Sequence, residues 1–515
     1  MSTNSPYLIV ASSLDLWRWQ KVLPAELGSL PQLSMLSFKA NRLHTVPSNS
    51  LAPSVQWLIL SDNRLRTLPE SLGHLRGLRK LMLAGNRLEC LPKSLSNCVH
   101  LELVRLADNN LTALPMELLS LPKLGWIALA SNGFNRALAA RARALVPTAS
   151  GTVTVLDAEK PLGRGASGVV YRGSLKDNQR SAAVPKAVAV KVFAASKTSD
   201  GDPADEAAAT GLAGASSCPH LMQSYGKLPS LPQALASTTD TAAAAASNPS
   251  AVTVADDKIK GLVLELLDGY TALAGPPSFA SVTRDVFVGD GADVAPSSTG
   301  GDSRNSGSPC SVTGVVNDVS QASPDDDLWP GEALSPARVL TLKFAVGVLR
   351  SVSAALAELH ALGLSHGDVY GHNILLRPPL ATSRDGAGTK VAANDSSAAA
   401  NEDGWAVLSD LGAAFFYKTT PQAQADSAQI GNSEGFEEGA ASLLERVEVL
   451  AFGHLTAELL ARLHPDQPTS APHFTSAIAS LQELVADCRE PAVSARPNFT
   501  EVHRRIFAVG ERGAQ

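Results

Sequence analysis

The first 145 residues carry a repeating pattern of apolar positions. The frame L-x-x-L-x-L-x-x-N-x-L occurs five times, and its asparagines lie 22, 23, 23 and 23 residues apart, at Asn41, Asn63, Asn86, Asn109 and Asn132. Apolar residues that alternate over such a short run are typical of a strand with one buried face. One unit of this length cannot bury its own apolar face, so the pattern predicts that successive units stack into a continuous core.

The third unit shows what the frame does. We expect Leu78, Leu81 and Leu83 to point into the core, and the amide of Asn86 to satisfy buried backbone groups where the strand ends. A period of about 20 to 29 residues with this frame is the signature of leucine-rich repeats, which the region resembles. Caps are expected at both ends, over residues 8–32 (with Leu14, Trp17 and Leu23) and in a helix over residues 136–145.

The strand positions that alternate outward should form an exposed concave sheet, and several of them are unexpectedly apolar. Aromatic residues and arginine are enriched in the energetic centres of protein interfaces. We therefore predict a protein partner on this face, contacted by Trp57, Met82, Leu103, Arg105 and Trp126. The alternative is that the face packs against the rest of the same chain.

From Val153 onward the pattern changes to short runs rich in β-branched residues. Gly163, Gly165 and Gly168 have G-x-G-x-x-G spacing, which alone is a weak signal because it also fits any tight turn or a dinucleotide site. Here a strand follows the glycines, not a helix, which disfavours the dinucleotide site. The next run, V-A-V-K, ends at Lys191, a strand lysine suited to reach phosphates.

Motifs further along agree with protein kinases in order and spacing. The segment HGDVYGHN has Asp368 and Asn373 five residues apart, and SDLG contains Asp410. The segments E-V-L-A-F-G from Glu448 and Cys488 to Pro497 look like the later helices of the kinase fold. Residues 153–508 thus resemble a protein kinase, and the motifs are similar to an atypical group of leucine-rich-repeat protein kinases with H-G-D in the catalytic loop.

The resemblance implies a role for each residue of these motifs. Lys191 would hold the phosphates of ATP, and Glu206 on the following helix would hold Lys191 by a salt bridge, with Asp205 as a rival. Asp368 would accept the proton of the acceptor hydroxyl, beside Asn373. These assignments predict phosphoryl transfer, which needs the triphosphate held, its charge neutralised and a hydroxyl aligned.

The same resemblance implies ATP and Mg²⁺ as cofactors. Asn373 and Asp410 would carry the metal. Residues of the Gly-rich loop, the lysine strand and the hinge would bind the nucleotide: Leu162, Gly163, Arg164, Gly165, Ala166, Ser167, Gly168, Val170, Ala189, Lys191, Glu265 and Leu267.

Three positions in the catalytic loop depart from the kinase pattern. Gly367 replaces the arginine that grips a phosphorylated activation loop, so activation by that route is not expected. Tyr370 replaces the lysine of Ser/Thr kinases and removes a charge aimed at the γ-phosphate. His372 leaves the acceptor class open between Ser/Thr and Tyr, and Ser/Thr is our interpretation.

The segment after Gly412 is the least regular part of the pattern. It has no A-P-E, and Glu437 or Glu438 is the expected partner of Arg496 in its place. Three hydroxyl side chains there are candidates for modification, although solvated surface residues are the commoner case: Tyr417, Thr419 and Thr420.

The sequence predicts a multi-domain α/β chain. A leucine-rich-repeat solenoid over residues 1–148 precedes a two-lobed α+β kinase fold over residues 151–510. Three stretches of low apolar content cannot order themselves and are predicted to be disordered insertions, at about 231–257, 276–333 and 379–403.

Composition refines this picture. The net charge of -6 is uneven, with the first 145 residues at +8 and the remainder at -14, which is compatible with an acidic partner for the repeats. Five scattered cysteines without a C-x-x-C pair favour a reducing compartment. No stretch predicts a leader peptide or a membrane span, so we expect a cytoplasmic protein with no nucleic-acid partner.

The sequence therefore predicts an ATP-dependent protein kinase whose repeats recognise a protein partner in intracellular signalling. One alternative is a nucleotide-binding pseudokinase scaffold with little or no transfer activity, favoured by Gly367, Tyr370 and the missing A-P-E. A small-molecule kinase on the same fold is a weaker alternative.

Overall fold

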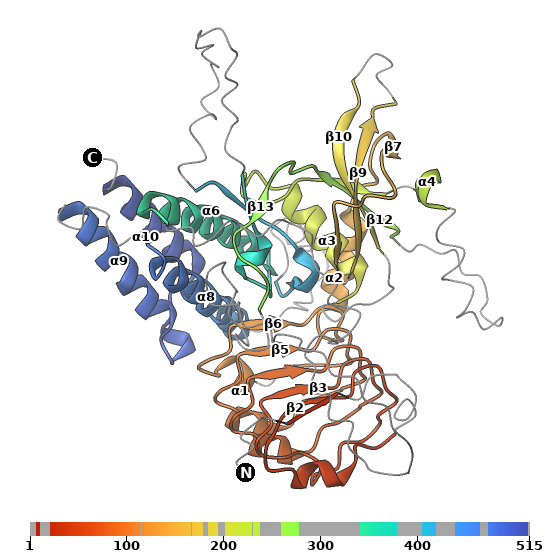
Figure 1. Cartoon of the computed structure of the whole chain (residues 1–515), viewed down its shortest axis with the longest axis vertical. Coiled ribbons are helices and arrows are strands. Elements are labelled where there is room, and N and C mark those ends of the chain that lie inside the picture. Colours follow the sequence, from red (N-terminus) through yellow and green to blue (C-terminus); the bar gives the residue numbers. More distant parts are fainter. Residues whose placement is uncertain are drawn as a thin grey trace, which may run out of the picture.

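The computed structural model describes most of the chain in two adjoining regions (Figure 1). We call residues up to 148 the repeat unit and residues from 149 onward the second unit. Predicted insertion 379–403 and most of the other two lie outside the described residues, which are 7–10, 21–113, 116–165, 167–178, 184–193, 201–228, 230–236, 259–277, 340–377, 404–418, 438–463 and 472–512.

The repeat unit is a parallel sheet with one short strand per repeat, in the order β1-β2-β3-β4-β5-β6. The strands are β1 Tyr7–Val10, β2 Leu33–Ser37, β3 Trp57–Ile59, β4 Lys80–Met82, β5 Leu103–Arg105 and β6 Trp126–Ala128. Short helices return the chain between strands: η1 Ala25–Ser29, η2 Glu70–His74, η3 Lys93–Asn97 and α1 Met116–Leu119. The predicted stack of strand and return segment is confirmed.

The frame asparagines act as the sequence predicts. The side-chain oxygen of Asn86 accepts a hydrogen bond from the backbone N–H of Leu65 at 3.1 Å, and its nitrogen donates to the carbonyls of Leu60 and Leu83, each at 2.9 Å. The amides of Asn63, Asn86, Asn109 and Asn132 each link two repeats in this way, so these asparagines fix the stacking distance while satisfying buried backbone groups. The frame leucines between them are fully buried.

The predicted capping helix is α2 Arg136–Leu145, with Leu138, Ala139 and Ala142 buried. These residues pack in one apolar cluster with the second unit, so α2 joins the two units as well as closing the stack. At the other end Leu23 is buried, whereas Leu14 and Trp17 lie outside the described residues.

The second unit begins with an antiparallel sheet in the order β11-β12-β10-β9-β7, with β8 paired to β9. Its strands are β7 Thr152–Val155, β8 Gly163–Gly165, β9 Gly168–Lys176, β10 Lys186–Phe193, β11 Ser224–Lys227 and β12 Gly261–Glu265. Helix α3 Pro203–Gly214 contacts this sheet through β11, and the short α4 Gln233–Ala236 lies inside the first predicted insertion.

The rest of the second unit is mainly helical (Figure 1). Its helices are α6 Leu342–Ala361, α8 Glu438–Leu460, α9 Pro472–Cys488, α10 Phe499–Arg512 and the single turns η5 Gly371–Asn373, η6 Leu411–Ala413 and η7 Val493–Ala495. Two small sheets carry the loops between them: β13 Thr271–Ala272 with β15 Ile374–Leu376 and β16 Ala406–Leu408, and β14 Leu364–Ser365 with β17 Phe415–Phe416.

The hydrophobic core is continuous across the two units. Leu103 and Trp126 belong to the same buried cluster as Leu349 of α6 and Phe452 of α8. A second cluster joins the repeat leucines to residues of the second unit, among them Phe415. Because a shared core of this kind resembles the inside of one domain, the two units form a single body.

This packing corrects the prediction for the concave face. Leu103, Arg105 and Trp126 are only 5%, 6% and 2% exposed, because the second unit covers them. The alternative of packing within the chain holds for these three residues. Trp57 and Met82 are partly exposed, although Met82 also packs against the shared core.

Tyr417 is a second correction. Its side chain is fully buried and its hydroxyl hydrogen-bonds to Nδ1 of His360 at 2.6 Å, so it is neither solvated nor open to modification. Burial also raises its pKa far above the ordinary value. Thr419 and Thr420 lie outside the described residues.

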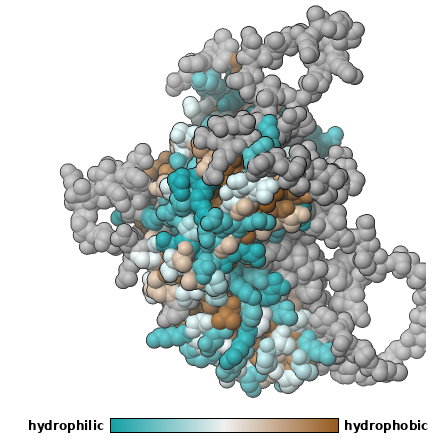
Figure 2. Space-filling view, turned by 90° about the vertical axis from the view of Figure 1, so that its left-hand side faces the viewer, coloured by the Kyte–Doolittle hydropathy of each residue, from teal (hydrophilic) through white to brown (hydrophobic). Residues whose placement is uncertain are grey.

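The molecular surface is mostly polar where it can be seen. Figure 2 shows one side of the molecule as largely hydrophilic, with hydrophobic residues in small separate patches among the coloured atoms. Among the described helices, none combines the length and the hydropathy needed to cross a bilayer.

Candidate functional site

The predicted lysine and glutamate pair forms. Lys191 on β10 makes an ion pair and hydrogen bond with Glu206 on α3, and the two side chains are 13% and 5% exposed. Burial raises the pKa of Glu206, and the charge of Lys191 opposes that rise. Lys191 thus has its position fixed by a buried carboxylate.

The rival, Asp205, has a different partner. Its carboxylate pairs with Arg143 of α2 at 2.7 Å and accepts a hydrogen bond from the Ser131 hydroxyl at 2.5 Å. The two acids are adjacent on α3 and point to different neighbours, so Glu206 is the partner of Lys191 and Asp205 anchors α3 to the repeat unit.

Asp410 lies next to this pair. It follows β16 with a left-handed backbone, φ 56°, and one carboxylate oxygen accepts the backbone N–H of Gly412 at 3.2 Å. The pKa of Glu206 is raised mainly by burial, and the negative charge of Asp410 raises it further, against the charge of Lys191. The Asp410 side chain is exposed, so its carboxylate is open to a ligand.

Asp368 and Asn373 meet in the loop between β14 and β15. The Asn373 amide donates to the backbone carbonyl of Asp368 at 2.9 Å and to its carboxylate at 3.0 Å. The backbone N–H and hydroxyl of Ser409 both donate to the Asn373 carbonyl at 2.9 Å. Because β15 and β16 are antiparallel and Ile374 pairs with Leu408, Asn373 before β15 and Asp410 after β16 lie at the same end of the two strands.

Glu448 of α8 holds this loop through hydrogen bonds to its backbone, a role that the sequence analysis missed. Its carboxylate accepts the backbone N–H groups of His366 at 3.2 Å and Gly367 at 2.5 Å, and His360 contacts it at 2.7 Å. Burial acts to raise the pKa of Glu448, but the hydrogen bond and charge of His360 lower it below the ordinary value. The motif E-V-L-A-F-G predicted the helix that carries Glu448, but nothing in the nearby sequence predicted that Glu448 binds the backbone of His366 and Gly367.

His366 ties the loop to the segment that carries Asp410. Its Nδ1 accepts the backbone N–H of Asp368 at 3.2 Å, which leaves Nε2 to donate to the Ser409 carbonyl at 3.0 Å. One imidazole therefore sets the spacing of the two acidic segments.

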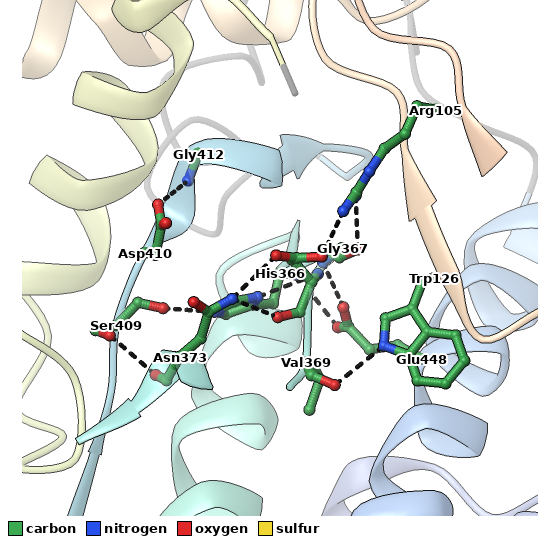
Figure 3. A network of polar contacts seen from close by, with 11 residues as sticks. Arg105, Trp126, His366, Gly367, Val369, Asn373, Ser409, Asp410, Gly412 and Glu448 are labelled. Atoms are coloured by element: carbon green, nitrogen blue, oxygen red, sulfur yellow. Dashed lines mark hydrogen bonds and ion pairs between the residues drawn. The ribbon is translucent and has the colours of Figure 1, made fainter. Parts of the chain in front are cut away.

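Arg105 is the second residue that the sequence analysis did not place here. From β5 of the repeat unit it makes an ion pair with the Asp368 carboxylate at 2.5 Å and donates to the Gly367 carbonyl at 3.3 Å (Figure 3). Burial tends to raise the pKa of Asp368, but Arg105, with His372 and His366, lowers it overall. Asp368 is therefore a carboxylate at neutral pH.

Most of the predicted nucleotide residues lie on or next to the neighbouring strands around Lys191. The Gly-rich segment is a hairpin in which Gly165 pairs with Gly168, and a side chain at Gly168 would collide with the Val192 carbonyl at 2.2 Å. Val170, Ala189 and Leu266 share one apolar cluster. Ala166 lies outside the described residues. Gly163 and Arg164 lie in β8, Leu162 directly precedes β8, and Ser167 directly precedes β9. Glu265 ends β12, and Leu267 follows it.

A metal ion at this site would have oxygen ligands. No cluster of three or more His, Cys, Asp or Glu able to hold a metal occurs in the described part of the chain. The candidate pair is Asp410, with its exposed carboxylate, and Asn373, whose amide nitrogen faces Asp368. One or two protein oxygens completed by substrate phosphates are what Mg²⁺ commonly uses, so the donor set fits.

The predicted partner of Arg496 is not tested, since Glu437 and the side chain of Glu438 lie outside the described residues. Arg496 is buried and donates to the carbonyls of Glu490 at 2.8 Å and Pro122 at 2.7 Å. The second contact is another link to the repeat unit.

Comparison with known proteins identifies the repeats. A leucine-rich-repeat family model matches residues 31–88. A solved leucine-rich-repeat protein of Leptospira interrogans is similar over 22% of this chain and 29% of its own, with 30% identity and a TM-score of 0.21, which is too low to support an argument about arrangement. No curated protein matches. Residues 31–88 are thus leucine-rich repeats, a module of protein interaction.

Proposed function

We propose that this chain is a protein kinase that transfers the γ-phosphoryl group of Mg-ATP to serine or threonine hydroxyls, on a two-lobed kinase fold. The observation that carries the proposal is the convergence of the Lys191–Glu206 pair, Asp410, and the Asp368–Asn373 pair. These groups come from segments that are far apart in the sequence. Phosphoryl transfer needs this combination of cation, metal-binding oxygens and base.

Each side chain has a task in the proposed reaction. Lys191 holds the phosphates, and the Gly-rich hairpin lets backbone N–H groups approach them. Bound between Asn373 and Asp410, Mg²⁺ would neutralise charge on the phosphates. Asp368 accepts the hydroxyl proton as the acceptor oxygen bonds to the γ-phosphorus and the bond to the bridging oxygen of ADP breaks.

The repeats supply partner recognition in this proposal. The early strands offer Trp57, whose ring lies 4.0 Å from Lys80 Nζ, on the part of the concave face that stays partly exposed. The chain works in the cytoplasm, which is supported by the free thiols of the four cysteines among the described residues, Cys90, Cys98, Cys218 and Cys488.

A nucleotide-binding scaffold without transfer activity is the second candidate. It is favoured by Gly367 and Tyr370, which remove two cations from the loop of Asp368. Against it stands the complete set of Lys191, Asp368, Asn373 and Asp410, since a scaffold has no chemical need for all four.

Labelled ATP separates the two. Purified full-length protein is incubated with Mg²⁺ and γ-labelled ATP beside Lys191→Met and Asp368→Asn, with the exposed Lys176→Met and the partly exposed Asp177→Asn as matched controls. Label is expected on the wild type and both controls only. Equal label on all five proteins contradicts the proposal, and an ATP-induced rise in Tm without any label supports the scaffold.

A further inference from the structure

A residue of the repeat unit lies in direct contact with the candidate base. The Arg105 side chain is 8% exposed and the Asp368 side chain 18%, and their closest atoms are 2.5 Å apart. Arg105 also donates to the Gly367 carbonyl, so it contacts both the backbone of the loop and the carboxylate of Asp368. The two residues are separated by 263 positions in the chain.

The loop of Asp368 lacks a cation of its own at the positions where the kinase resemblance expects two. At Gly367, φ is +76° and an added Cβ would lie 2.7 Å from the carbonyl oxygens of Ile127 and Ala413. A side chain is therefore excluded by the backbone of both units, at Ile127 and at Ala413. At Tyr370 the ring stacks on Trp126 of the last repeat, with centroids 4.9 Å apart.

Arg105 brings a cation into the space that these two residues leave uncharged. Asp368 uses one carboxylate oxygen for Arg105 and the other for Asn373. An ionised carboxylate has about four acceptor positions, so positions remain for an acceptor hydroxyl. The contact with Arg105 is thus compatible with Asp368 acting as a base.

A removable inhibitory plug would be a different explanation of the same contact. It would require an interface that separates reversibly. Instead the repeat unit is fixed at three further points: Trp126 Nε1 donates to the Val369 carbonyl at 3.0 Å, Arg143 pairs with Asp205, and Arg496 donates to the Pro122 carbonyl. The shared hydrophobic core lies between these points, as in obligate interfaces.

We propose that Arg105 is a positioning and charge-supplying residue of the phosphotransfer site, and so that the repeat unit is part of that site. This inference rests on the proposed function. Arg105 holds Asp368 in place and supplies the positive charge that Tyr370 cannot. As the hydroxyl oxygen bonds to the γ-phosphorus, ADP leaves with the electron pair of the broken P–O bond, the proton passes to Asp368, and the guanidinium offsets negative charge on the carboxylate and phosphoryl group.

The test compares Arg105→Gln and Arg105→Lys with Arg79→Gln in the full-length chain. Arg79 pairs with Glu102 within the repeat sheet and serves as the matched control. Steady-state transfer from Mg-ATP to dephosphorylated casein gives kcat and the KM for ATP, alongside autophosphorylation. Because glutamine still donates hydrogen bonds, we expect the fold to persist, which the ATP-induced rise in Tm checks.

We expect Arg105→Gln to lower kcat about 100-fold with the KM for ATP nearly unchanged. Arg105→Lys should recover at least about tenfold of that loss because the charge returns, and Arg79→Gln should match the wild type. A structural role alone would not be rescued by charge.

Three results overturn the inference while leaving the proposed function intact. The first is equal kcat for Arg105→Gln and wild type, and the second is a higher kcat for Arg105→Gln, the signature of a plug. The third is a fall in kcat that lysine does not rescue, because the charge is then irrelevant. A wild type that labels neither casein nor itself overturns the proposed function and this inference together.

Discussion

The second and fifth repeats carry a tryptophan at the same position of the frame, with opposite fates. The backbone register runs from Trp57 through Lys80 and Leu103 to Trp126. Trp57 stays partly exposed beneath Lys80, whereas Trp126 is 2% exposed and stacks on Tyr370 and His454. The repeat frame decides which residues face outward, and the tertiary structure decides what meets them. One end of the concave sheet remains surface while the other is built into the site.

The largest expected effect is the loss of stability on replacing Trp126, and it tests the comparison of the two tryptophans directly. Trp126→Ala removes a fully packed ring and its hydrogen bond to Val369, so we expect a loss of about 3 to 5 kcal/mol in the free energy of unfolding. Trp57→Ala should lose less than about 1 kcal/mol. Urea denaturation of the two variants measures both values. Similar losses for the two would contradict the different fates assigned to them.

The second prediction concerns the anchor of α3. Arg143→Met leaves the buried Asp205 carboxylate without its cation, which should destabilise the fold by about 2 kcal/mol. The exposed Arg141→Met on the same helix is the control, expected within about 0.5 kcal/mol of the wild type. Since α3 also carries Glu206, Arg143→Met should weaken ATP binding as well, as measured by calorimetric titration. Unchanged ATP affinity in a destabilised variant would confine the anchor to a structural role.

The smallest effect concerns Lys80, between the two ends of the concave sheet. Burial, and then the charge of Arg105, lower the pKa of Lys80 to about 8 from the ordinary 10.5. The unfolded lysine keeps its proton up to the higher value, so between pH 8 and 10.5 stability relative to Lys80→Met should rise with pH. Labelling by an amine-reactive reagent, followed by peptide mass spectrometry, should reach half its maximal rate near pH 8 at Lys80. Labelling of Lys80 only in step with the ordinary lysines would count against this placement.

The repeats could be predicted from the sequence because their determinants are local. Frame leucines, the asparagine ladder and the helix over residues 136–145 all depend on spacing within one or two repeats. The members of the candidate site, Lys191, Asp368, Asn373 and Asp410, could be found because motif order is itself a sequence property, although their roles remain predictions.

The contacts between the units could not be predicted. Arg105 and Trp126 looked like partner-binding residues, because nothing local reveals that residues more than 240 positions away cover them. The choice between Asp205 and Glu206 had the same origin: both acids lie on one turn of α3, and Arg143 and Lys191 decide between them. Tyr417 was misjudged because its burial depends on His360 and on the repeat core.

Calorimetric unfolding of the full-length chain, with and without Mg-ATP, tests most directly whether the repeats and the nucleotide site are one body. The account predicts a single cooperative transition that includes the repeats and moves as a whole to higher temperature when Mg-ATP is added. Two separate transitions, with Mg-ATP shifting one and leaving the repeats where they were, would contradict it.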